Sequence, residues 1–226
     1  MVELKFCGLT RAQDAAQAAR LGARYVGVIF AGGPRLLSPD RAAVVLRAVP
    51  PGVRRVGVFA AASPEEVSAV ATIAELDVAQ LHGDPLPGTV AALRRHFSGE
   101  IWAVVRSADG SLPETLPALF DAADAVVLDA KVPGALGGTG VALPWDSMAA
   151  PLARARRGSA AARLVLAGGL TAENVAAAIA ALGPEVVDVS SGVESAPGVK
   201  DHARMRDFAA AVFATRTTGA ARSIID

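Results

Sequence analysis

The sequence predicts an α/β fold, a (β/α)8 or TIM barrel, on three observations. Short runs rich in β-branched residues alternate eight times with longer segments rich in Ala, Leu and Arg. The 226 residues match the size of such a barrel. The turn Cys7-Gly8-Leu9-Thr10 lacks the glycine fingerprint typical of the alternative, an open doubly wound sheet. We therefore predict one barrel domain over residues 1–214 and a loosely ordered tail over 215–226, which has no periodic apolar pattern.

In the first half of the chain, each apolar run is followed by a helix with recognisable ends. The runs predict strands at residues 4–7, 25–30, 55–59 and 78–82. Thr10 is expected to cap the first helix, and Gly22 to stop it. Ser38-Pro39 and Ser63-Pro64 open the next two helices, with serine as the cap and proline in the first turn. A fourth helix is expected from about Gly88 to Phe97.

The second half repeats the pattern less regularly. Further apolar runs predict strands at residues 101–105, 125–129, 164–167 and 186–189. The helix between the first two, Leu112 to Phe120, is weak because prolines interrupt it. The longest irregular stretch, Lys131 to Pro144, precedes a helix that begins near Trp145. Thr171 is a candidate cap for the seventh helix, and the last helix is expected over Asp201 to Phe213.

Composition narrows the classes of function. Lysine plus arginine and aspartate plus glutamate balance at 22 each, so no basic surface for nucleic acid or an anionic membrane is predicted. A single cysteine forms no internal disulfide, and no apolar run reaches the length of a membrane span. The start of the chain is too short and charged for a signal peptide. The three histidines are scattered, which predicts no metal site. We expect a cytoplasmic protein without a metal or cofactor.

In a barrel of this type, the reacting groups lie where the strands end, because the loops after the strands build the mouth. Glycines follow the seventh strand, at Gly168 and Gly169, and the eighth, at Ser191 and Gly192. Such turns let backbone N–H groups approach an oxyanion closely, so these four residues predict a phosphate site. The alternative is that the glycines serve only to make tight turns.

Cys7 ends the first strand and Asp129 ends the sixth, so they can face one substrate from opposite sides of the mouth. An acid and a base placed in this way suit a reaction in which one atom gains a proton and another loses one. A thiolate would be the base in a modestly electropositive site, and a protonated carboxyl group would be the acid. The alternatives are a buried structural cysteine, and an aspartate bound to a loop amide or to Lys131.

Two further residues are candidates for substrate binding. Arg35 follows Gly32-Gly33-Pro34 on a stiffened turn, where its guanidinium can hold a carboxylate with two hydrogen bonds. A solvated arginine is the alternative. His82 ends the fourth strand and is either a hydrogen-bond donor at the mouth or a satisfied core histidine.

Several motifs together carry a resemblance to a known family. In chain order they are Lys5-Phe6-Cys7-Gly8-Leu9-Thr10, Gly27-Val28-Ile29-Phe30, Pro34-Arg35, Ser38-Pro39, Gln80-Leu81-His82-Gly83, Leu128-Asp129, Gly137-Gly138-Thr139-Gly140, Leu166-Ala167-Gly168-Gly169-Leu170 and Asp188-Val189-Ser190-Ser191-Gly192-Val193-Glu194. From roughly Val2 to Phe213 the chain resembles the phosphoribosylanthranilate isomerases of tryptophan biosynthesis. The resemblance implies an aldose–ketose isomerase of a small phosphorylated substrate. Its reaction is the Amadori rearrangement of N-(5′-phosphoribosyl)anthranilate to 1-(2-carboxyphenylamino)-1-deoxyribulose 5-phosphate.

The resemblance also implies roles for single residues. Asp129 would protonate the furanose ring oxygen and open the sugar to a Schiff base, and Cys7 would remove the C2′ proton. Arg35 would hold the anthranilate carboxylate, and the loop containing Gly138 and Gly140 would close over the sugar. The chain departs from the family at Gly33, where Ser is frequent, and at Leu143-Pro144, where Phe-Asp is frequent. Neither change touches the acid or the base.

Two other functions stay open at this stage. The related isomerase of histidine biosynthesis is similar in fold, but it carries a carboxylate at the end of strand one, where this chain has Cys7. A catalytically silent barrel that binds phosphorylated metabolites is the alternative from another class. Either a monomer or a homodimer fits a barrel of this size.

Overall fold

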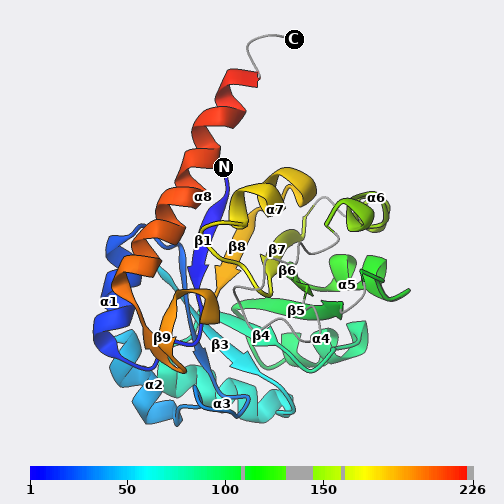
Figure 1. Cartoon of the computed structure of the whole chain (residues 1–226). Coiled ribbons are helices and arrows are strands. Elements are labelled where there is room, and N and C mark those ends of the chain that lie inside the picture. The colour runs from blue at the N-terminus through cyan, green and yellow to red at the C-terminus, as the bar shows by residue number, and fades with distance from the viewer. Residues whose placement is uncertain (108–109, 131–144, 159–160, 223–226) are drawn as a thin grey trace.

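In the computed structural model, which describes residues 1–107, 110–130, 145–158 and 161–222, parallel strands close into a barrel (Figure 1). The ring follows chain order, and β1 pairs in parallel with both β2 and β8. The strands are β1 (Glu3–Phe6), β2 (Tyr25–Ile29), β3 (Arg54–Phe59), β4 (Val78–Leu81), β5 (Glu100–Ser107), β6 (Ala125–Ala130), β7 (Arg163–Ala167) and β8 (Val186–Val189). The predicted barrel is therefore confirmed.

A helix follows each strand and lies on the outside of the barrel (Figure 1). The helices are α1 (Ala12–Arg20), α2 (Pro39–Leu46), α3 (Pro64–Ala74), α4 (Pro87–Arg94), α5 (Leu116–Ala122), α6 (Trp145–Ala155), α7 (Val175–Leu182) and α8 (His202–Arg222). The serine caps are as predicted, since Ser38 accepts a hydrogen bond from the Arg41 N–H. Ser63 forms a complete capping box with Glu66. No helix within the described ranges is long and apolar enough to cross a bilayer.

The expected cap at Thr10 is wrong. The first helix begins after Arg11, which makes no side-chain cap, and the Thr10 hydroxyl donates instead to the carbonyl of Gly198 at 2.5 Å. Gly198 lies in a small antiparallel hairpin of β9 (Glu194–Ala196) and β10 (Val199–Lys200), which the sequence analysis did not anticipate. The threonine therefore links the segment before α1 to the β9–β10 hairpin and does not cap a helix.

The end of the last helix is also corrected. We expected it to stop at Phe213, but α8 continues to Arg222 and projects beyond the other elements in Figure 1. Residues 214–222 contain no proline that would stop a helix; their three alanines and two arginines favour helix, whereas three threonines and Gly219 do not. Of the predicted tail, only residues 223–226 lie outside the described ranges.

Side chains on each strand alternate between two apolar layers. One layer packs between barrel and helices, and it includes Leu4 and Phe6 of β1. The other fills the barrel interior, where Tyr25 and Trp102 pack with ring centroids 4.8 Å apart. Lys5, between Leu4 and Phe6, is fully buried. The interior therefore changes from apolar to polar toward the ends of the strands, where the candidate site lies.

Candidate active site

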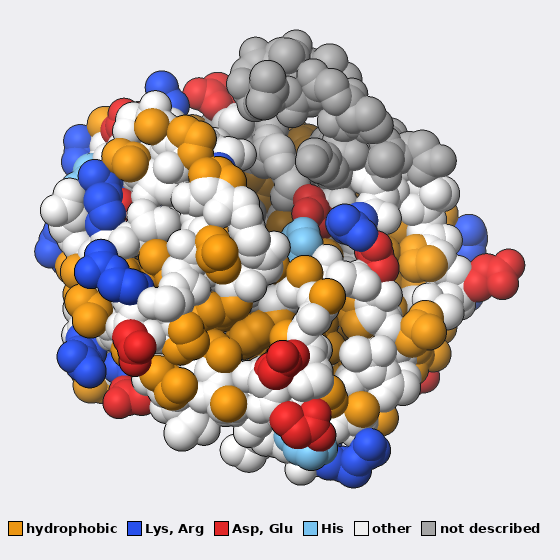
Figure 2. Space-filling view, turned by 90° about the horizontal axis from the view of Figure 1, so that it is seen from below, with side chains coloured by type: hydrophobic (Ala, Val, Ile, Leu, Met, Phe, Trp, Pro, Cys, Tyr) orange, Lys and Arg blue, Asp and Glu red, His pale blue; other side chains and the backbone are white. Residues whose placement is uncertain are grey.

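A cavity of about 420 Å³ opens where the strands end. Figure 2 views the molecule from this side and shows a hollowed surface with hydrophobic side chains at depth. All the described residues that the sequence analysis singled out line this cavity: Cys7, Arg35, His82, Asp129, Gly168, Gly169, Ser191 and Gly192. Gly138 and Gly140 lie outside the described residues. The barrel therefore brings together around one cavity residues that are as far apart in sequence as Cys7 and Gly192.

Cys7 directly follows β1, and its backbone N–H donates to the carbonyl of Val189 at 2.9 Å. Only 7% of the residue is exposed. Burial raises the pKa of the Cys7 thiol above its ordinary value of 9.0, although the charges of Lys5 and Lys200 act in the opposite direction. The neutral thiol is therefore the resting form, and the thiolate that we expected is not favoured in the free site.

Beneath Cys7 lies a polar group that the sequence analysis missed. The Lys5 ammonium donates to Asp188 Oδ2 at 2.5 Å and to Gln80 Oε1 at 3.0 Å. All three side chains are buried inside the barrel. The signal that was available is a charged residue at an inward position of an apolar strand, which occurs in both β1 and β8.

Arg35 does not stand alone at the mouth. Its Nε and Nη2 atoms donate to the two carboxylate oxygens of Glu194, at 2.9 and 2.6 Å. The buried Lys200 ammonium donates to the same carboxylate at 2.7 Å. Burial by itself would raise the pKa of Glu194, but hydrogen bonds from Arg35 and Lys200 lower it overall. The alternative of a solvated arginine is wrong, because an opposing carboxylate holds this guanidinium beside the cavity.

The side chains of His82 and Asp129 lie next to each other on the lining of the cavity. Nε2 of His82 lies 3.7 Å from Oδ2 of Asp129, and about a third of the histidine side chain is exposed. His82 is therefore a residue of the mouth and not of the core. The Asp129 carboxylate retains 17% exposure, which leaves it accessible from the cavity.

The glycine turns lie at the ends of the neighbouring strands β7 and β8. Gly168 and Gly169 have φ angles of 87° and 66°, which side-chain-bearing residues rarely adopt. A Cβ at Gly192 would lie 2.1 Å from the carbonyl oxygen of Leu170, so only glycine fits this approach of the two turns. These glycines thus leave the backbone of the two turns accessible on one side of the cavity.

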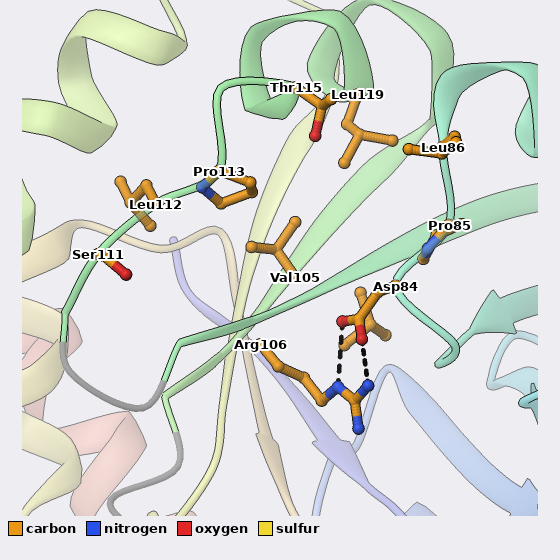
Figure 3. A pocket seen from close by; sticks show the side chains of 11 residues that line it. Asp84, Pro85, Leu86, Val105, Arg106, Ser111, Leu112, Pro113, Thr115 and Leu119 are labelled. Carbon is orange, nitrogen blue, oxygen red and sulfur yellow. Dashed lines mark hydrogen bonds and ion pairs between the residues drawn. The ribbon is translucent and has the colours of Figure 1, made fainter.

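A second cavity of about 430 Å³ lies outside the barrel, between the turns that precede α4 and α5 (Figure 3). Asp84 and Arg106 pair across it through two hydrogen bonds. About half of each side chain is exposed. Because its charged groups satisfy each other and no catalytic candidate lines it, we place the chemistry in the first cavity.

Comparison with known proteins decides the family. The family model of N-(5′-phosphoribosyl)anthranilate (PRA) isomerase matches residues 4–211. The chain belongs to this family. The PRA isomerase of Rubrobacter xylanophilus is 45% identical over 213 residues, which cover 93% of this chain and 98% of the relative.

Solved structures agree with this assignment. The phosphoribosylanthranilate isomerase of Thermotoga maritima has a TM-score of 0.82 and 32% identity, and the match covers 95% of this chain and 100% of that one. Another phosphoribosylanthranilate isomerase was solved with reduced 1-(o-carboxyphenylamino)-1-deoxyribulose 5-phosphate. It has a TM-score of 0.78 and 30% identity, with the same shares covered. The chain is thus an isomerase of tryptophan biosynthesis.

Proposed function

We propose that this chain carries out the Amadori rearrangement of N-(5′-phosphoribosyl)anthranilate with Asp129 as the general acid and Cys7 as the general base. The observation that carries the assignment is that both side chains, which come from strands on different sides of the ring, line one cavity. Proton donation to the ring oxygen and proton removal from C2′, which are both bonded to C1′, require two groups in this arrangement.

The reaction begins with two proton transfers. Asp129 gives a proton to the furanose ring oxygen, the C1′–O bond breaks, and the electron pair of the nitrogen forms a Schiff base. Cys7 then takes the C2′ proton to give an enolamine, which tautomerises to the ketone. His82 lies near enough to Asp129 to orient its carboxyl group or to contact the sugar. Since the free thiol is the resting form, the site has to stabilise the thiolate before the second transfer.

The remaining contacts hold the two charged ends of the substrate. Arg35 keeps one nitrogen, Nη1, outside its hydrogen bonds to Glu194, and we assign the guanidinium to the anthranilate carboxylate. Gly168, Gly169, Ser191 and Gly192 present backbone to the phosphate. Closure of a loop at Gly138 and Gly140 stays a prediction, because those residues are not described.

The test follows the loss of phosphoribosylanthranilate fluorescence. Cys7→Ser and Asp129→Asn should each lower kcat by about 10²-fold or more, as the loss of acid–base catalysis typically does. Asp121→Asn is the matched control, because Asp121 is an exposed carboxylate of α5, away from the cavity. Near-normal turnover in either of the first two variants removes that residue from its role.

Arg35→Met should raise KM more than it lowers kcat, because it removes a binding contact. Unchanged kinetic constants would contradict the assignment.

We place the enzyme in the cytoplasm, as a monomer or a homodimer. A related enzyme from Thermotoga maritima is described as dimeric, and sedimentation velocity at several concentrations distinguishes the two states.

A further inference from the structure

The buried ammonium of Lys5 is a charge that the proposed reaction does not yet use. It is fully enclosed in the barrel, where Asp188 and Gln80 accept its hydrogen bonds. A buried ion pair contributes little net stability, because removing two charges from water offsets their attraction. Branched apolar residues would fill the same interior layer of a barrel. Stability alone therefore does not account for a lysine at this position.

Lys5 lies directly beside the thiol. Lys5 and Cys7 are two residues apart at the end of β1, so both point into the barrel. A methyl group at Gly27 of the neighbouring strand would lie 3.0 Å from the Cys7 sulfur and 3.4 Å from Cε of Lys5. The Cys7 sulfur and Cε of Lys5 thus both lie next to the same position, where Gly27 has no side chain.

The other charged groups around Cys7 lie on other elements of the fold, and its cations, like Lys5, are paired with carboxylates. Lys200, from β10, and Arg35, from the turn before α2, both bind the carboxylate of Glu194. Asp188, from β8, carries a negative charge that opposes a thiolate. On the other side of the cavity, His82 and Asp129 face each other. Lys5 is therefore the cation two residues before the thiol in the chain. Burial by itself would lower the pKa of Lys5, but Asp188 and Cys7 raise it overall.

We propose that Lys5 is a positioning residue for the isomerisation: its ammonium, fixed by Asp188 and Gln80, stabilises the negative charge that Cys7 carries when it acts as the base. The inference rests on the proposed role of Cys7. In the free enzyme burial outweighs this charge, which keeps the thiol protonated. Without Lys5, a Cys7 thiolate would face the Asp188 carboxylate with no counterion on its own strand.

The test uses the fact that Cys7 is the single cysteine of the chain, so iodoacetamide alkylation reports on it alone. Alkylation rates are measured against pH in the wild type and in Lys5→Met. The variant keeps an unbranched side chain, one atom shorter, and loses the charge. We expect alkylation of the variant to be at least about tenfold slower at a fixed pH below the thiol pKa, since one pKa unit is a tenfold change in thiolate. Identical pH profiles would overturn the proposal.

A second pair of variants separates this role from a structural one. Lys5 is also the counterion of Asp188, so Lys5→Met leaves a buried carboxylate unpaired and can prevent folding. Asp188→Asn and the double variant Lys5→Met/Asp188→Asn contain no such carboxylate. We expect the double variant to be alkylated about tenfold more slowly than Asp188→Asn. Coincident profiles would mean that Lys5 only neutralises Asp188, and would overturn the proposal by themselves.

Turnover supplies an independent readout. In Lys5→Met and in the double variant, kcat should fall and its rise with pH should move to higher pH, while KM stays near that of the matching parent. A loss expressed in KM alone would contradict the proposal. Alkylation does not depend on turnover. An active Cys7→Ser enzyme would therefore refute the role of Cys7 as base, and the alkylation comparison would still decide whether Lys5 stabilises the thiolate.

Discussion

Gly27→Ala tests how accurately the base must be placed. The new Cβ would lie 3.0 Å from the Cys7 sulfur, whereas ordinary contacts of this kind begin at 3.4 Å. The sulfur therefore has to move by about 0.4 Å. A displacement of about 1 Å costs on the order of 10²-fold in rate, so a shift of this size should lower kcat about fivefold to tenfold. KM should stay unchanged, because the proposed carboxylate and phosphate contacts lie elsewhere on the cavity wall.

Stability should change little in the same variant. Crowding a packed interior costs about 1 kcal/mol at the mild end, and replacing a strand glycine by alanine returns about 0.5–1 kcal/mol. The measurements are steady-state kinetics by substrate fluorescence and a urea melt. The control is Gly88→Ala, in the first turn of α4, where an added Cβ meets no atom within 4 Å. It should keep kcat and gain up to about 1 kcal/mol. Unchanged kcat in Gly27→Ala would refute the claim that the thiol needs its present position.

Three further changes have definite expected outcomes. Glu194→Gln should lower the free energy of unfolding by about 3 kcal/mol in urea melts, because the buried Lys200 loses its counterion. The pKa of Glu194 in the folded protein lies below its ordinary value of 4.5, so the loss of stability is full above pH 4.5 and shrinks as the pH falls through the folded-state pKa. A difference in stability that does not depend on pH would contradict this explanation. Gly192→Ala should weaken inhibition by inorganic phosphate at least about tenfold, since its Cβ would meet backbone at 2.1 Å; unchanged inhibition argues against a phosphate site there. Ser63→Ala should cost about 1 kcal/mol without changing kcat.

The features that the sequence predicted correctly are those determined by residues close together in the chain. Serine followed by proline marked the starts of α2 and α3, because both capping partners lie within one turn. The eight strands were visible as apolar runs, and the candidate residues at their ends line one cavity, because parallel strands in a barrel all end on the same side.

What the sequence did not reveal depends on barrel closure. Lys5 meets Asp188 across 183 residues, and Arg35 meets Glu194 across 159. The Thr10 hydroxyl was assigned to its own helix, yet its partner Gly198 is 188 residues away. In each case, the nearby sequence suggested either a plausible but wrong partner, as for Thr10, or no partner at all. The true partner becomes a neighbour only when β1 pairs with β8, and no short-range rule contains that information.

These long-range pairs also determine how the site can attract its substrate. Around Cys7, the described residues Lys5, Arg35 and Lys200 supply three positive charges, and Asp188 and Glu194 supply two negative ones. One positive charge remains in excess, although each cation is held by a carboxylate. A substrate that carries a carboxylate and a phosphate then gains more from oriented donors, the Arg35 guanidinium and the backbone of the glycine turns, than from net charge. The same pairing keeps the cations from moving toward the substrate, so Lys5 stays beside the thiol, where the developing negative charge needs it.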